Sequence, residues 1–224
     1  DPMNSKARFA YANMLELNGM YELYLEQLKF IQENTPDKIT KKVSDKIEAY
    51  ESLLSDTLSK KWNVDSFYLD KTRWNIAIFY TDETNSFIHA DANRIAALAA
   101  SDVFSGIAIT SVKSQVTPVS SYSEAFKNAR NNKFDYFVIL SVSESDEDIT
   151  LKSSFYSGRT GTEISKENFY STGNNKFSTV LRRFRNSILE KLTVKGKILN
   201  RNGKQLLVDL GKAENIVENA EFKI

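Results

Sequence analysis

Apolar residues recur at helical spacing through the first part of the chain. From Ser5 to Asn18 they stand three or four positions apart, and Asn18-Gly19 then supplies a turn. The same spacing predicts a second helix from about Tyr21 to Asn34, ended by Thr35-Pro36, and a third helix from Val43 to Lys60. The opening segment is therefore predicted to be entirely helical.

The hydrophobic period shortens to that of strands at Trp74. The run from Trp74 to Tyr80 predicts a short buried strand, and a polar loop from Thr81 to Ala90 follows it. An alanine-rich helix is predicted from Asp91 to Ser105, with Asp91 as its N-cap. The pattern then predicts a strand from Gly106 to Val112 and a helix from Ser121 to about Asn132, opened by a capping box of Ser121 and Glu124. Three strands are predicted next: Phe134 to Val142, a strand after the acidic turn Glu144 to Asp148, and Thr162 to Tyr170. A helix from Asn175 to Leu192 follows them.

The end of the chain returns to strict alternation. Val194 to Leu199 and Gln205 to Leu210 alternate like an antiparallel pair joined by the hairpin turn Asn202-Gly203. A final strand is predicted at Phe222. We expect this small β module to continue beyond Ile224.

Together these elements predict an α+β protein in which helices pack on a mixed sheet. The change from helical to strand period sets the first boundary, and the return to alternation sets the last. The expected organisation is a helical segment, a linker, an α/β domain and a C-terminal β module, over residues 1–62, 63–73, 74–192 and 193–224.

The second helix and its flanks resemble the tetratricopeptide repeat. The matching positions are those of the repeat's small residue, turn glycine, second-helix packing residues and terminal proline: Ala12, Gly19, Tyr21, Tyr24, Leu28, Ile31 and Pro36. Tyr24 and Ile31 depart from the pattern, which has small residues there, and Ile39 to Lys60 lacks the repeat's glycine. The resemblance implies one repeat followed by a capping helix, an arrangement that holds other proteins.

Two further resemblances concern the rest of the chain. The α/β domain resembles the module shared by the amino-terminal domain of TolB, the lipoprotein LpoB and the periplasmic part of CsgG, through the segments WNIAIFY and AFKNARNNKFDYFVIL. The last residues are similar to the carboxy-terminal module of the flagellar ring protein FlgT. The matching positions are Gly196, Gly203, Val208, Leu210, Gly211, Val217 and Phe222, although Asn219-Ala220 replaces a usual glycine.

These resemblances imply a non-catalytic, periplasmic protein of the bacterial envelope. With the repeat in front, the arrangement also resembles the periplasmic flagellar collar proteins of spirochaetes. A signal or anchor, if one exists, is expected outside this sequence.

Charge and composition limit the cofactors and partners that the chain is expected to bind. Lys and Arg number 30 against 29 for Asp and Glu, which gives no global attraction to nucleic acid or anionic lipid. The sequence contains no cysteine and one histidine, His89, so it holds no disulfide, thiolate or multi-histidine metal site. No apolar run approaches the roughly 20 residues of a membrane helix. We therefore expect no cofactor, no nucleic-acid partner and no membrane insertion.

One loop offers a chemical alternative. Asp82, Glu83, His89 and Asp91 crowd the chain after the first predicted strand, where α/β sheets commonly bind ligands. The carboxylates of Asp82, Glu83 and Asp91 could serve as acid, base or magnesium ligands in a carboxylate-dependent enzyme. We favour a solvated loop and a helix cap, because no second carboxylate cluster is placed to meet the first.

Two sets of side chains are candidates for partner binding. First-helix positions face the concave surface in the geometry of the repeat. Here these positions are Lys6, Phe9, Asn13 and Glu16. The last predicted helix has a basic outer face that could meet an anionic partner. Its arginines are Arg182, Arg183 and Arg185. Both sets could instead be ordinary solvated helix faces.

We therefore expect a non-catalytic scaffold or adaptor of the periplasmic flagellar collar or ring, required for motility. Its partners would be envelope or flagellar motor proteins, with self-association in a ring as an option. One alternative is a regulator that docks on an envelope synthase, as an LpoB-like protein would, and another is the carboxylate- or metal-dependent enzyme. A scaffold predicts a multivalent assembly, whereas a regulator predicts a one-to-one complex.

Overall fold

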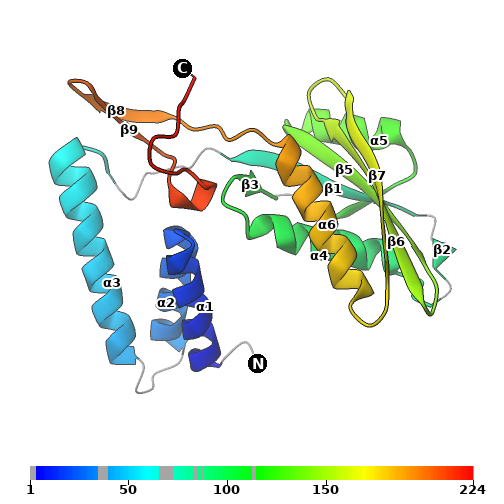
Figure 1. The fold of residues 1–224 in the computed structure, drawn as a ribbon, viewed down its shortest axis with the longest axis horizontal. Helices are drawn as coiled ribbons and strands as arrows, with labels where there is room; N and C mark the ends of the chain where they lie inside the picture. Colours follow the sequence, from blue (N-terminus) through cyan, green and yellow to red (C-terminus); the bar gives the residue numbers. More distant parts are fainter. Residues whose placement is uncertain are drawn as a thin grey trace. The chain divides into compact units, whose positions relative to one another are not determined.

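The chain folds into two compact units. The computed structural model describes residues 4–34, 40–65, 73–82, 85–86, 88–112 and 115–223. The helical unit contains residues 1–72 and 195–224, and the α/β unit contains residues 73–194. The predicted α+β class is confirmed, since helices come first, a mixed sheet with helices follows, and a two-stranded sheet comes last (Figure 1). None of the helices in the described ranges is long and apolar enough to cross a membrane.

The helical unit is built around one apolar core. Its elements are α1 (Ser5–Leu17), α2 (Tyr21–Asn34), α3 (Thr40–Leu54), the π-helix η1 (Ser55–Lys61), β8 (Ile198–Asn202), β9 (Gln205–Val208) and the 3-10 helix η3 (Lys212–Glu214). Apolar side chains of α1, α2 and α3 form the core: Ala12, Leu15, Tyr24, Leu28, Ile31, Val43 and Ile47. The third predicted helix is thus a 15-residue α-helix that continues as a π-helix.

The carboxy-terminal residues belong to the helical unit. The predicted hairpin around Asn202-Gly203 is confirmed as β8 and β9. The side-chain amide of Asn200 donates a hydrogen bond of 2.6 Å to the carbonyl oxygen of Trp62 at the end of η1. A β-carbon on Gly19, in the turn between α1 and α2, would lie 3.0 Å from the backbone nitrogen of Ala213 in η3. Gly19 has a φ of +75°, which glycine adopts at no steric cost.

The α/β unit has one sheet between two layers of helix. Its elements are β1 (Trp74–Thr81), β2 (Asn85–Ser86), α4 (Ala92–Ser105), β3 (Thr110–Ser111), β4 (Thr117–Val119), α5 (Tyr122–Asn131), β5 (Tyr136–Glu144), β6 (Asp148–Ser157), β7 (Glu163–Thr172) and α6 (Lys176–Lys191). The strand order is β3-β1-β5-β6-β7, with β2 beside β5 and β4 beside β1. β1 and β5 are parallel, whereas β5, β6 and β7 form an antiparallel meander.

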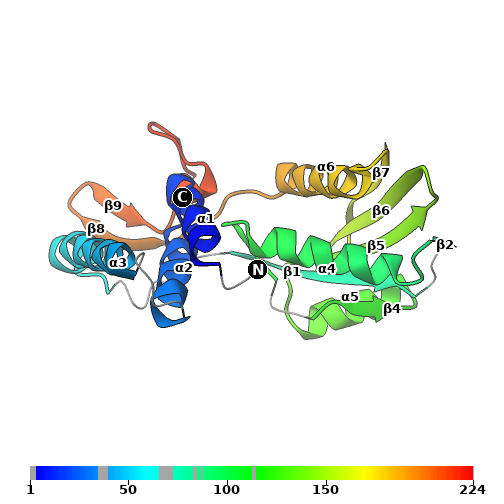
Figure 2. The same ribbon diagram turned by 90° about the horizontal axis from the view of Figure 1, so that it is seen from below.

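The two faces of this sheet are covered unequally. α4 and α6 pack on one face, where their apolar side chains meet those of β1, β5 and β6. α5 packs on the opposite face, against Ala77, Phe79 and Phe137 of β1 and β5. Figure 2 shows α6 and α5 on opposite sides of β1. On the α5 side, Lys152 of β6 and Tyr170 of β7 are exposed.

Asn93 ties α4 to the ends of two strands. The pairing of β1 with β5 stops at Tyr80 and Leu140. Beyond it, the side-chain oxygen of Asn93 accepts a 2.6 Å hydrogen bond from the Val142 amide, and its nitrogen donates a 2.8 Å bond to the Thr81 carbonyl. Asn93 is only 3% exposed. Its amide therefore acts as an extra peptide group between the strand ends, and this satisfies groups that would otherwise be buried without partners.

The second predicted strand is mostly a turn. The structure retains only Thr110–Ser111 of the range Gly106–Val112. The hydroxyl of Thr110 donates a 2.6 Å hydrogen bond to the Phe104 carbonyl, and the Thr110 amide donates to the Ile107 carbonyl. The chain from Gly106 to Ile109 thus turns after α4, and only Thr110 and Ser111 pair with β1.

Both predicted helix caps differ in detail. Asp91 occupies the N-cap position of α4, but its carboxylate bonds Arg94 at 2.8 Å and makes no cap hydrogen bond. The Ser121 hydroxyl does accept a bond from the Glu124 amide. Glu124, however, accepts from the amide and hydroxyl of Ser120 instead of from Ser121, so the capping box is displaced by one residue. These bonds from Ser120 lower the pKa of Glu124.

The predicted strand at Phe222 is wrong. After η3 the described chain turns through Asn215, which has a φ of +59°, and Phe222 is 52% exposed. Parts of the predicted linker, of the loop from Thr81 to Ala90, and the repeat's proline lie outside the described residues.

We expect the substitution Asn93→Ala to lower the free energy of unfolding by about 2 kcal/mol, because the buried Val142 amide loses its acceptor. Urea denaturation followed by circular dichroism measures this change. Arg94→Ala, at the neighbouring exposed position, is the matched control and should leave stability almost unchanged. Equal effects of the two substitutions would contradict the bridging role of Asn93.

Candidate functional site: a groove in the helical unit

The apolar stripe of α3 extends farther than the helix packed against it. α2 contains 14 residues, whereas α3 and η1 together run from Thr40 to Lys61. Val43 and Ile47 are buried in the core with α2. Tyr50 and Leu54 continue the same stripe at helical spacing and are only partly covered. The mismatch leaves a groove where α2 begins.

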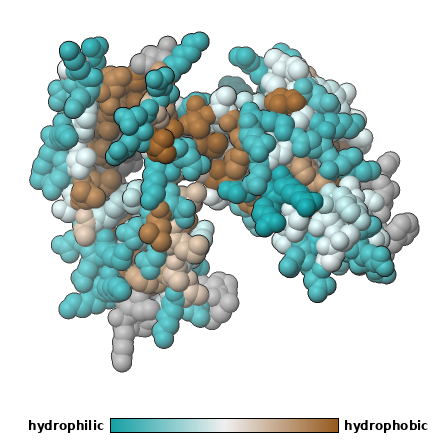
Figure 3. All heavy atoms as spheres, viewed as in Figure 1, coloured by the Kyte–Doolittle hydropathy of each residue, from teal (hydrophilic) through white to brown (hydrophobic). Residues whose placement is uncertain are grey.

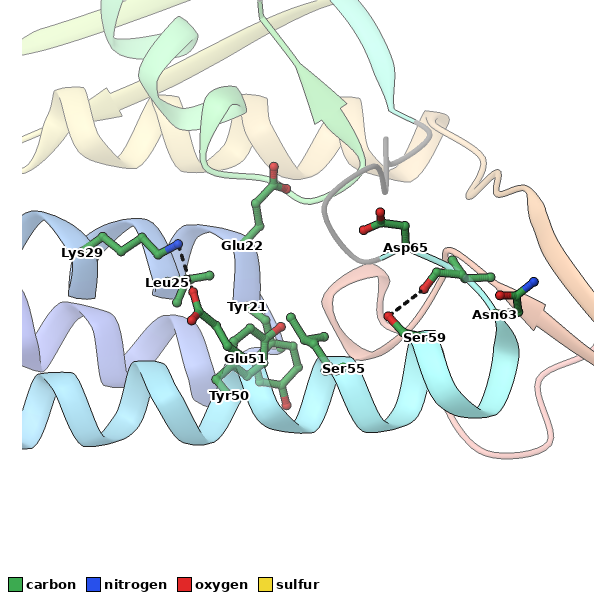
Figure 4. A pocket seen from close by; sticks show the side chains of 13 residues that line it. Tyr21, Glu22, Leu25, Lys29, Tyr50, Glu51, Ser55, Ser59, Asn63 and Asp65 are labelled. Carbon is green, nitrogen blue, oxygen red and sulfur yellow. Dashed lines mark hydrogen bonds and ion pairs between the residues drawn. The ribbon is translucent and has the colours of Figure 1, made fainter.

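The groove has a volume of about 790 Å3. Its lining combines aromatic and aliphatic side chains with a charged and polar rim: Gly19, Tyr21, Glu22, Leu25, Lys29, Tyr50, Glu51, Leu54, Ser55, Ser59, Asn63, Val64 and Asp65. Figure 4 shows the labelled members of this lining on α2, on α3 and η1, and on the segment after η1. A concave, largely apolar site with a few polar groups is typical of binding sites in proteins.

Two stacked tyrosines form the centre of the groove. The rings of Tyr21 and Tyr50 lie 5.5 Å apart at 23°, and the ring of Tyr24 meets Tyr50 edge-on at 6.1 Å. Burial raises the pKa of Tyr50 to about 12, and the neighbouring Tyr21, Tyr24 and Glu22 act in the same direction. The raised pKa reports how far the Tyr50 ring is withdrawn from water, and an aromatic ring in this position suits an apolar contact surface.

Charged pairs hold α1, α2 and α3 together beside the groove. Lys46 of α3 forms an ion pair of 3.0 Å with Glu16 of α1 and a 3.4 Å hydrogen bond with the Tyr24 hydroxyl. Burial lowers the pKa of Lys46, but its bonds to Glu16 and Tyr24 outweigh this, so the pKa is raised. Lys29 of α2 pairs with Glu51 of α3 at 3.2 Å on the groove rim (Figure 4).

The residues predicted to line a concave surface are placed differently from the groove. Glu16 is engaged by Lys46, and Phe9 packs on the core with the Lys42 ammonium 5.3 Å from its ring centre. Lys6 is exposed and Asn13 is half-buried, and neither lines the groove. This face of α1 is thus turned largely toward α3.

The three arginines of α6 differ in exposure and in hydrogen bonding. The guanidinium of Arg183 donates a 2.6 Å hydrogen bond to the carbonyl oxygen of Tyr170 in β7. Arg182 is exposed and Arg185 is half-buried. Only Arg183 is therefore fixed at the edge of the sheet by a hydrogen bond that the structure describes.

The acidic loop after β1 is linked to a more distant carboxylate. His89 Nδ1 lies 2.9 Å from Glu144 Oε2, and Lys176 Nζ lies 4.0 Å from Glu144 Oε1. Asp91 pairs with Arg94, and Glu83 lies outside the described residues. Across the described ranges, no group of three or more His, Asp or Glu side chains converges in a way that could hold a metal ion.

Sequence reasoning missed both the groove and Glu144. The third predicted helix contains Tyr50 and Leu54, but the length mismatch that exposes them appears only when α2 is seen beside α3. Likewise, 55 positions separate His89 from Glu144. Pairs at such separation depend on the strand order, which local patterns do not fix.

Comparison with known proteins concerns mainly the α/β unit. The model for the TPASS_0648 family, second domain, matches residues 73–190. A point variant of the PelC dodecamer from Paraburkholderia phytofirmans is 16% identical, with 55% of this chain and 92% of that chain covered and a TM-score of 0.40. TolB from Acinetobacter baumannii is 9% identical, with 55% and 30% covered and a TM-score of 0.36.

A further similar structure is the LpoB C-terminal domain from Salmonella enterica, which is 15% identical, with 54% of this chain and 96% of that chain covered and a TM-score of 0.32. TolB and LpoB, named in the resemblance stated from the sequence, thus recur among solved structures at low similarity. No curated protein matches the chain. The helical unit and its groove are outside the family match.

The raised pKa of Tyr50 gives a test of the stacked tyrosines. Unfolded tyrosine ionises near pH 10 and folded Tyr50 at about 12, so the unfolded chain loses this proton first as pH rises. The contribution to stability is therefore complete below about pH 10 and is lost between about pH 10 and about pH 12. Urea denaturation should therefore show a smaller loss of unfolding free energy between about pH 10 and about pH 12 in Tyr50→Phe than in the wild-type chain. A phenolate absorbance difference between the two folded proteins centred at pH 10 would contradict the stacked geometry.

Proposed function

This chain belongs to the TPASS_0648 family, and we propose that it serves as a non-catalytic scaffold that holds other proteins in the bacterial cell envelope. The observation that carries this proposal is the tyrosine-lined groove of the helical unit. The groove offers a continuous apolar surface with a charged rim, and protein-binding hot spots are enriched in tyrosine in this kind of setting.

The outer face of α1 supports the same function. Tyr11, Met14 and Leu17 are 50%, 61% and 70% exposed and lie three residues apart, so they form one stripe along the helix. Figure 3 shows a separate group of apolar side chains on the visible face of the helical unit, where β8 and β9 lie in Figure 1, bordered by hydrophilic ones. Contiguous exposed apolar surface is a mark of protein interaction sites.

Two of the charged groups that could carry catalysis, His89 and Asp91, have structural partners, and so does the nearby Lys176. His89 faces Glu144, Asp91 faces Arg94, and Lys176 donates hydrogen bonds to backbone carbonyls of Ser145, Asp146 and Asp148. These contacts favour a scaffold over the carboxylate-dependent enzyme. The finer proposal is a periplasmic protein of the flagellar collar or ring, supported by the sequence resemblances to the tetratricopeptide repeat and to the envelope modules.

Adjacent leucines of α3 allow a matched test of the groove. Leu54 lines the groove, whereas Leu53 is 60% exposed and does not line it. We expect Leu54→Arg to reduce capture of the native partner by about tenfold or more, because a buried hot-spot contact is replaced by a charge. Leu53→Arg should retain capture. Quantitative mass spectrometry after affinity purification from native cells measures both.

The identity of the captured partner decides the finer proposal. Flagellar motor proteins lost only in Leu54→Arg would support a role in the collar or ring, and that variant should then reduce motility. Recovery of an envelope synthase in a one-to-one complex would instead show a regulator. Equal capture by both leucine variants would contradict the groove as the binding site.

A further inference from the structure

β7 forms an open edge of the sheet. It is paired with β6 on one side, and no described strand lies on its other side. A bulge at Phe155 and Tyr156 disturbs the pairing at one end of β7, while the stretch from Ser165 to Thr172 is regular. Such an edge presents backbone amides and carbonyls in the spacing of a missing strand.

The hydrogen-bond pattern shows which residues of β7 point outward. At the turn between β5 and β6, the Ser145 amide donates a hydrogen bond to the Asp148 carbonyl. In an antiparallel pair, every second residue points its amide and carbonyl at the partner strand, so Thr150, two residues after Asp148, points its own groups toward β5. Tyr170, opposite Thr150, therefore turns its own groups away from β6. The bond from Arg183 to the Tyr170 carbonyl agrees with this direction. By the same alternation, Asn168 and Lys166 also point their amides and carbonyls outward.

Basic side chains flank the regular part of this edge, whereas the exposed Glu163 lies at its other end, beside the bulge. Lys166 of β7 and Lys152 of β6 are exposed on the sheet face that α5 leaves open, on neighbouring positions of the two strands. On the other side of the edge, the guanidinium of Arg183 reaches the Tyr170 carbonyl from α6. The carboxylate of Glu167 is paired with Lys191 at 2.5 Å. Positive charge thus flanks the regular part of β7 on both sides.

We propose that the β7 edge binds an extended, acidic segment of a partner protein as an additional strand of the sheet. The outward amides and carbonyls of Lys166 and Asn168 would supply main-chain hydrogen bonds, which is how strand addition gains affinity. The Tyr170 carbonyl, by contrast, already accepts a hydrogen bond from Arg183. Lys152, Lys166 and Arg183 would select a segment with acidic side chains. This site is independent of the groove in the helical unit.

The same basic residues limit non-selective pairing at this edge. Charged side chains on an edge discourage pairing with apolar strands and with a second copy of the same basic edge. An acidic strand is not discouraged, because basic side chains repel another basic strand but attract acidic side chains. The edge is therefore selective by the sign of charge.

Asn168 allows the backbone to be tested with little disturbance of the fold. Proline at an edge position whose amide faces outward removes that donor without breaking a bond of the sheet. The probe is a fluorescent peptide of about eight residues, the usual length of a strand, with alternating glutamate and valine. Binding to the full chain is followed by fluorescence anisotropy.

The proposal expects saturable binding that Asn168→Pro weakens by about tenfold and Asn168→Ala leaves within about twofold. Lys166→Glu should also weaken binding by about tenfold, since attraction becomes repulsion. Circular dichroism confirms that each variant is folded; if Asn168→Pro is not, a probe methylated on alternate amides replaces it and should bind as weakly.

Three results would overturn the proposal: no saturable binding up to roughly 1 mM peptide, unchanged binding by Asn168→Pro or by the methylated probe, or equal binding of a glutamate–proline peptide that cannot form a strand. Leu54→Arg should leave peptide binding intact, so failure of the edge and failure of the groove are distinguishable.

Discussion

The helical unit depends on a mismatch of length between two packed helices. Where α2 and α3 lie together, the stripe of α3 is buried, and this burial supplies the core through Val43 and Ile47. Where α3 and η1 run past the start of α2, the stripe continues without a full partner. The groove follows from this arrangement, while burial of the Tyr50 ring beside Tyr21 and Tyr24 raises the pKa of Tyr50. A π-helix at the far end of the stripe is a feature often found at functional sites.

In the α/β unit, helices cover the two faces of the sheet unequally. On one face, α4 and α6 bury the apolar side chains of the sheet, and Asn93 completes the hydrogen bonding where β1 and β5 separate. On the other face, α5 covers β1 and β5, while exposed side chains of β6 and β7 remain. The open edge therefore borders the part of the α5 face that no described helix covers, while α6 packs on the other face and bonds β7 through Arg183.

Much of the fold could be predicted from the sequence because hydrophobic periodicity is a local signal, as the observed bounds of β5, β6, β7, α4 and α6 show. The prediction fails where a side chain bonds the backbone: the Thr110 hydroxyl bonds the Phe104 carbonyl, and the predicted strand from Gly106 begins only at Thr110. The candidate site was less predictable. Repeat-like spacing directs attention to α1, whereas the cavity lies on α2, α3 and η1, and only the position of β7 distinguishes Arg183 from its neighbouring arginines. Relative helix length and strand order are tertiary properties, and periodicity carries no information about them.

The two proposed surfaces differ in the physical basis of binding. The groove would gain affinity mainly from apolar and aromatic burial, which salt screens weakly, and its charged rim contains the Lys29–Glu51 pair. The β7 edge would owe its selectivity to exposed basic side chains, whose attraction falls with distance over about 10 Å at 0.1 M salt. A scaffold with both could hold one partner through burial under most conditions and exchange another as ionic strength changes. The difference arises from the residues themselves: tyrosine and leucine line one surface, while lysine and arginine flank the other.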